Sequence, residues 1–141
     1  DQSETVNAIE SLQLFMNRYP ESPKLDSCEN IIYRLRDKLE VKAFESAKLY
    51  YQTENYKAAS VALKNVLTDY PDTKYKEDIM FLVVKSDFRL ADNSIEKKKA
   101  ERFRQTIESY LKFADDFPSS MWLKEAEGYY NRSLEALEKI K

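Results

Sequence analysis

The chain has 141 residues, of which 43% are apolar and 34% charged, a balance typical of one folded domain and not of a disordered chain. One glycine and four prolines supply too little tight-turn chemistry for a strand-rich fold, so the composition favours an all-α protein. Because 25 acidic and 23 basic residues nearly cancel, nothing in the bulk charge points to nucleic acid or an anionic membrane surface as a partner.

Apolar residues spaced three or four apart predict about six helices and no strand. The first predicted helix spans residues 3–19. The second runs near 24–52 without a breaker, which gives a length of about 45 Å. A short turn at 53–55 leads into a helix over 56–70. A fourth helix follows and ends at the polar stretch 92–94, a fifth spans 95–116, and a sixth reaches the end of the chain.

One short motif ends three of these helices: an aromatic residue, a proline, an acidic or small residue, and a hydroxyl. The copies are Tyr19-Pro20-Glu21-Ser22, Tyr70-Pro71-Asp72-Thr73 and Phe117-Pro118-Ser119-Ser120. A recurring helix–proline–helix junction is typical of repeat proteins, whose units bury their cores by stacking on neighbours. The last residues of each copy are expected to cap the next helix, with Pro23 as a first helical residue.

The spacing around Pro71 matches a tetratricopeptide repeat, a helical hairpin with a period of about 34 residues. With Pro71 in the proline position, the remaining repeat positions fall on Ala47, Tyr50, Tyr56, Ala59, Leu63 and Val66. Small side chains at 47 and 59 would let the two helices approach closely, and Tyr50 and Leu63 would fill the space around that contact. The sequence therefore predicts a solenoid of helical hairpins.

Pro20 and Pro118 extend this alignment to the rest of the chain and predict one tetratricopeptide-like domain over 1–141. Residues 1–22 would be the second helix of a truncated repeat, whose first helix would precede the chain. Residues 24–73 would form an extended central repeat, 74–118 a third repeat with an insertion near 92–100, and 119–141 a closing helix. The prolines are 51 and 47 residues apart, and the long second helix and the insertion account for the excess over the repeat period.

Four segments together resemble the BamD family, the repeat-built lipoproteins of the bacterial outer-membrane β-barrel assembly machine. They are Tyr33–Leu39, Ala47–Tyr51, Asn55–Ala59 and Val66–Thr73. The resemblance covers most of residues 10–90, and the long helix separates it from ordinary tetratricopeptide proteins. The region after Ser94 is longer and more basic than this family would lead one to expect.

The resemblance implies the C-terminal half of a non-enzymatic periplasmic scaffold that binds the POTRA domains of the barrel-forming insertase and other assembly lipoproteins. It also implies a lipid anchor outside this chain as the sole membrane contact, at the periplasmic face of the outer membrane. A different tetratricopeptide adaptor, linked to the cell envelope or to chaperones, is the alternative.

Candidate partner-binding residues lie on the face of the long helix that would line the concave side of a solenoid. They are Val41, Phe44, Lys48, Tyr51 and Gln52. An aromatic–basic–aromatic row of this kind could grip a peptide, although Phe44 and Tyr51 could instead pack on the preceding repeat. On the last helix Trp122 is expected in the core and Tyr130 on the surface, as a further candidate.

Nothing in the sequence predicts a catalytic or cofactor site. The chain has no histidine, which removes the commonest general base and metal ligand, and Cys28 is its single cysteine, expected to be a buried thiol. The basic run from Lys97 to Arg104 is interrupted by Glu101 and is expected to be a solvated helix face. A binding role is therefore favoured over an enzymatic one.

Overall fold

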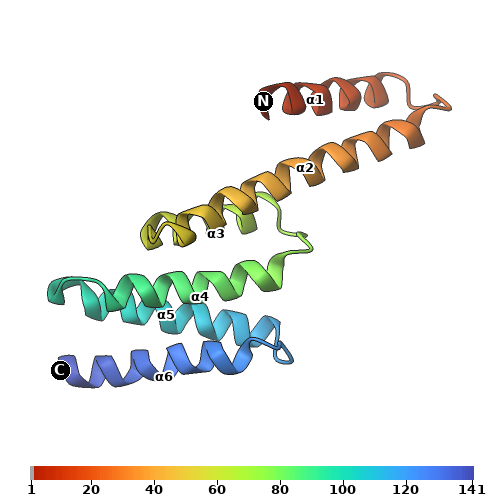
Figure 1. Cartoon of the computed structure of the whole chain (residues 1–141). Coiled ribbons are helices and arrows are strands. Elements are labelled where there is room, and N and C mark those ends of the chain that lie inside the picture. Colours follow the sequence, from red (N-terminus) through yellow and green to blue (C-terminus); the bar gives the residue numbers. More distant parts are fainter. Residues whose placement is uncertain (1) are drawn as a thin grey trace. The chain divides into compact units, whose positions relative to one another are not determined.

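The computed structural model describes residues 2–141, which form six α-helices and no strand (Figure 1). The helices are α1 (Gln2–Arg18), α2 (Leu25–Gln52), α3 (Tyr56–Asp69), α4 (Lys76–Asp92), α5 (Glu96–Asp116) and α6 (Leu123–Ile140). The prediction of an all-α, tetratricopeptide-like fold with one long second helix is confirmed. The described part of the chain divides into two compact units, residues up to Ala43 and residues 44–141, and the division falls inside α2.

The first compact unit contains α1, the turn after it and α2 as far as Ala43. Ile9 and Cys28 are buried here, at 8% and 7% exposure, so the prediction of a buried thiol is confirmed. The rings of Phe15 and Tyr19 lie 5.2 Å apart at the end of α1. This ring contact connects the last turn of α1 to the junction that follows.

The second compact unit is built around α4, which contacts α3, α5 and α6 (Figure 1). Because α4 has neighbours on several sides, most of its residues from 79 to 91 are buried. The core of this unit includes two clusters. One consists of Met80, Phe81, Val84, Phe113 and Ala126, and the other of Phe88, Ala91 and Phe103.

The three aromatic–proline junctions share one backbone geometry. The aromatic N–H donates to the carbonyl oxygen four residues earlier at 2.9, 2.8 and 2.8 Å, which completes the helix before a proline that has no N–H. The hydroxyls of Ser22, Thr73 and Ser120 each accept the N–H two residues further on, at 3.1 Å. The next helix begins three residues after each hydroxyl, so these residues shape the turn and are not the predicted helix caps, and Pro23 precedes α2.

The small and aliphatic repeat positions are buried, Tyr56 is half-buried, and Tyr50 and Pro71 are exposed. Ala47, Ala59 and Leu63 have no exposed surface and Val66 has 3%, as close packing of small and aliphatic residues would produce. Tyr50 was expected to fill the space around this contact, but its side chain is 44% exposed. The next residue, Tyr51, turns inward instead, with its ring 5.4 Å from that of Tyr56.

The turn between α2 and α3 reverses the chain without glycine. Asn55 N–H donates to Tyr50 O at 2.8 Å and Glu54 N–H donates to Tyr51 O at 3.0 Å, the pair of bonds of a Schellman helix end. This geometry needs a left-handed residue, and Glu54 takes that place with φ of 62°. Asn55 then accepts the Ala58 N–H at 3.4 Å and caps α3.

Candidate functional site

A groove of about 630 Å³ lies in the second compact unit, between the end of α2, the first half of α4 and the residue that precedes α6. Five aromatic side chains line it together with charged and polar ones. The lining residues are Phe44, Glu45, Lys48, Tyr51, Gln52, Tyr75, Asp78, Phe81, Leu82, Lys85 and Trp122. It brings together segments that are up to 78 residues apart in the sequence.

Helix periodicity and the junction motif place these side chains. Phe44, Lys48 and Tyr51 are spaced four and three apart on α2, so they share one face, and Asp78, Phe81 and Lys85 share one face of α4. Tyr75 and Trp122 occupy the same place in two copies of the junction, five residues after the aromatic. The hydroxyls of Thr73 and Ser120 fix the backbone N–H of these two aromatics.

The aromatic walls of the groove are fixed by ring contacts. Phe81 and Trp122 stack nearly parallel, with their centroids 5.4 Å apart and their planes at 7°. Phe44 and Tyr75 lie 5.3 Å apart. Because these rings are in contact with one another, their side chains are already ordered before a ligand binds, which lowers the entropy lost on binding.

Three ammonium groups lie over these rings. That of Lys74 is 5.4 Å from the Tyr75 ring centroid, and those of Lys48 and Lys85 have carboxylate partners. Lys85 Nζ is 5.4 Å from the Tyr51 ring centroid and 5.5 Å from that of Phe81, and it lies 3.7 Å from Glu125 Oε2. Lys48 Nζ is 4.9 Å from the Phe44 centroid and 3.1 Å from Glu45 Oε1. Lys48 and Lys85 are thus held over aromatic faces and are neutralised by local ion pairs.

Polar residues of α4 and α6 lie beside the groove and interact with Tyr51 and with Glu125, the ion-pair partner of Lys85. Tyr129 on α6 donates its hydroxyl to Glu125 at 2.8 Å, and burial, followed by this hydrogen bond, raises the pKa of Tyr129 to about 12. The hydrogen bond between Arg89 and Tyr51 raises the pKa of Arg89, which stays charged. Tyr51 and Glu125, which take part in these contacts, both lie beside the Lys85 ammonium.

Asp78 differs from the other charged residues of the groove. The residue is half-buried, and its carboxylate has no hydrogen bond or ion pair with any residue in the range 2–141. The charges of the four lining residues Glu45, Lys48, Asp78 and Lys85 cancel, and so do those of the outer residues Glu125 and Lys74, the latter with its Nζ 5.4 Å from the Tyr75 ring centroid. Among the lining residues, Asp78 is therefore the carboxylate without an ion pair of its own within residues 2–141.

The structure brings four of the predicted binding residues into this groove: Phe44, Lys48, Tyr51 and Gln52. Phe44 and Tyr51 contact residues of later elements, Tyr75 and Tyr56, so they do not need the preceding repeat to cover them. Val41 does not line the groove, because it belongs to the first compact unit.

Tyr130 and Trp122 are both half-buried. Tyr130 was predicted to be exposed, but it is half-buried and stacks on Tyr110 with centroids 4.6 Å apart. Trp122 was predicted to lie in the core; it is half-buried, packs against the core cluster that contains Phe81, and also forms part of the groove wall. The stacking partners come from distant elements, so the sequence pattern alone did not indicate the half-burial of either residue.

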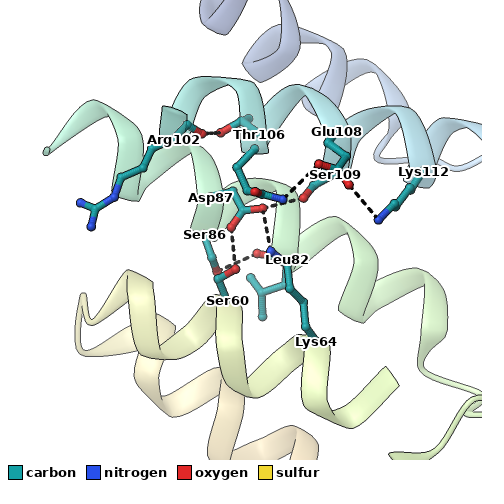
Figure 2. Close-up of polar contacts among 11 residues, drawn as sticks. Ser60, Lys64, Leu82, Ser86, Asp87, Arg102, Thr106, Glu108, Ser109 and Lys112 are labelled. Atoms are coloured by element: carbon teal, nitrogen blue, oxygen red, sulfur yellow. Dashed lines mark hydrogen bonds and ion pairs between the residues drawn. The ribbon is translucent and has the colours of Figure 1, made fainter. Parts of the chain in front are cut away.

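A buried polar cluster centred on Asp87 of α4 was not predicted from the sequence. Asp87 is 3% exposed and accepts hydrogen bonds from Ser60 on α3 and Ser109 on α5, both at 2.5 Å (Figure 2). Lys64 Nζ lies 3.6 Å from the same carboxylate. The available signal was a charged residue at 87, in helical spacing with the apolar positions 79, 83 and 91. The cluster connects three helices and is a structural element of the core.

Other candidate features have ordinary surface roles. Lys97, Lys98 and Arg104 are exposed, Lys99 pairs with Glu96 at 3.7 Å, and Arg102 donates to Ser94 Oγ at 2.7 Å, so the basic run is a solvated helix face as predicted. Within residues 2–141 no group of three acidic or cysteine side chains could hold a metal ion. None of the helices α1 to α6 is long and apolar enough to cross a membrane.

A comparison with protein-family models finds a match over most of the chain. The family model YfiO, described as an outer membrane lipoprotein, matches residues 1–102, which include α1 to α4 and the beginning of α5. No curated protein matches the chain.

Proposed function

The chain belongs to the YfiO family of outer membrane lipoproteins, and on this premise we propose that it is a non-enzymatic scaffold for assembly of outer-membrane β-barrel proteins. The match confirms the resemblance to the BamD family. We propose further that the full protein is lipid-anchored at the periplasmic face of the outer membrane. In this role the chain binds the POTRA region of the barrel-forming insertase and contacts other assembly lipoproteins.

The aromatic groove is the observation that carries the binding role. Tyrosine and tryptophan are enriched among the few residues that supply most of the binding energy at protein interfaces, because they bury large areas at a low cost in conformational entropy. Five of them line one groove here, and two pairs are already in ring contact. A partner segment that enters the groove would therefore gain contact area without ordering the groove first.

Tyr51 and Lys48 are the residues whose change tests this role most directly. Tyr51→Ala removes one aromatic wall and the ring beneath the Lys85 ammonium. Lys48→Glu reverses a charge that is partly exposed at the edge of the groove. Each change is expected to weaken binding of the full-length protein to the purified insertase POTRA region by about tenfold or more.

Lys98→Glu is the matched control, because it reverses an exposed charge on α5 away from the groove. Binding is measured by calorimetry, and recovery from envelope extract checks the partner. Failure of the wild-type protein to bind the POTRA region would refute the proposed partner. Equal weakening by the control and the groove variants would refute the groove as the binding surface.

A further inference from the structure

The unpaired carboxylate in the groove indicates which chemistry a partner would bring. The ammonium groups of Lys48 and Lys85 already have carboxylate partners at 3.1 and 3.7 Å, whereas Asp78 has none within residues 2–141. A ligand that enters the groove excludes water from Asp78 and leaves a charge without compensation unless the ligand supplies a cation. Charge complementarity therefore favours a basic side chain.

The surroundings of Asp78 favour arginine over lysine. The groove walls are aromatic, and three neighbouring ammonium groups already lie over ring faces, which shows that the rings accept cations. A guanidinium is planar, stacks flat on aromatic rings and donates two parallel hydrogen bonds to one carboxylate. Lysine offers a point charge that cannot do both.

We propose that the groove binds a protein segment that inserts an arginine side chain, with its guanidinium paired to Asp78 and stacked on the aromatic wall. This inference rests on the proposed function, because it specifies the partner segment for the same groove. The arginine is the anchor of the interaction, and the fixed rings exclude water around the new ion pair.

Stabilisation of the helix end is the competing role for Asp78. Glu77 and Asp78 both lie in the first turn of α4, where a negative charge interacts favourably with the helix dipole. Glu77 does not line the groove. Glu77→Gln therefore removes the same helix-end charge as Asp78→Asn and leaves the groove unchanged, which makes it the matched control.

The single tryptophan of the chain, Trp122, lies in the groove wall and reports occupancy by its fluorescence. Three pentapeptides are titrated, each with serine and glycine around a central arginine, lysine or citrulline. Citrulline has nearly the shape of arginine without its charge. The arginine peptide is expected to produce a saturable change, the lysine peptide to bind several-fold more weakly, and the citrulline peptide at least tenfold more weakly.

The variants complete this titration. Asp78→Asn is expected to weaken the arginine peptide about tenfold and to reduce the dependence on salt, while Glu77→Gln binds as the wild type does. Melting curves of the two variants check that both fold equally well. Equal binding of the arginine and citrulline peptides, no saturable binding of any peptide, or equal loss in both variants overturns the proposal.

Binding to the insertase POTRA region separates this inference from the proposed function. If the wild type binds that region and Asp78→Asn binds equally well, the arginine anchor is refuted and the scaffold role stands. If the wild type does not bind the region but binds the arginine peptide through Asp78, the proposed partner is refuted and the arginine site stands. If the wild type and Glu77→Gln bind the POTRA region and Asp78→Asn does not, both the proposed partner and the arginine anchor are supported.

Discussion

Replacing Asp87 by alanine is expected to destabilise the second compact unit by about 3 kcal/mol. The change removes the acceptor of two charge-assisted hydrogen bonds, which contribute about 1.5–3 kcal/mol each. Ser60 and Ser109, at 5% and 7% exposure, are left without this partner and with little access to water. The expected loss of about 3 kcal/mol is at the lower end of what two such hydrogen bonds contribute together, because removing a buried carboxylate also removes its desolvation cost. Lys64 contributes less than about 1 kcal/mol, since its side chain is 42% exposed.

Urea unfolding followed by Trp122 fluorescence measures this loss. With a slope of about 2 kcal/mol/M, a loss of about 3 kcal/mol lowers the urea midpoint by about 1.5 M. Asp87→Asn is the milder variant, because the amide can accept from one serine and donate to the other. It is expected to lose only the charge, at a cost of about 1–2 kcal/mol.

A triple variant, Ser60→Ala with Asp87→Leu and Ser109→Ala, tests the reasoning behind the magnitude. It removes every member of the serine–aspartate cluster and leaves no buried polar group unpaired. Its stability is expected to lie within about 1 kcal/mol of the wild type. A cost below about 1 kcal/mol for Asp87→Ala, or a triple variant as unstable as that single one, would refute the account.

Three further variants test local features. Gly128→Ala is expected to raise the free energy of unfolding by about 0.5–1 kcal/mol in the same assay, because Gly128 is within α6 and an added Cβ meets no atom within 4 Å; a loss would contradict this. Glu54→Gly is expected to stabilise by up to about 1 kcal/mol, because Glu54 adopts a left-handed conformation, whereas an unchanged midpoint would show that the turn is unstrained. Tyr129 has a folded pKa of about 12, above the ordinary value of 10.0, so its stabilising contribution is complete below pH 10 and is lost as the pH rises to 12. Tyr129→Phe should reduce the loss of stability between pH 10 and pH 12, and it should remove the ionisation step near pH 12 from the tyrosinate absorbance titration. If the variant keeps both the loss of stability and this ionisation step, the assignment is refuted.

The helix pattern was predictable because it depends on local signals. Four of the six helices were placed within one residue at each end, since proline and polar turns mark their limits. The burial of Ala47 and Ala59 followed from the spacing of small residues around Pro71. Periodicity could not decide between Tyr50 and Tyr51, because residues three and four positions after Ala47 both lie near its face.

The groove was only partly predictable for a different reason. Periodicity showed that Phe44, Lys48 and Tyr51 share a face of α2, but it could not show which distant residues lie opposite them. Trp122 lies 71 positions after Tyr51 in the sequence and contributes the facing wall. Asp78 was equally hidden, because an acidic residue in the first turn of a helix is ordinary until its neighbours are known.

The hydrogen bonds of Asp87 also have a consequence for how α4 is aligned lengthwise between α3 and α5. Sliding α4 by one turn, about 5.4 Å, would bring Val83 or Ala91 opposite the two serine hydroxyls. Both residues are buried and apolar, so the side chain of neither could accept a hydrogen bond, and the slip would leave both serine hydroxyls without an acceptor. We expect the triple apolar variant to keep its stability but to admit slipped alignments, visible as doubled amide resonances for residues of α4.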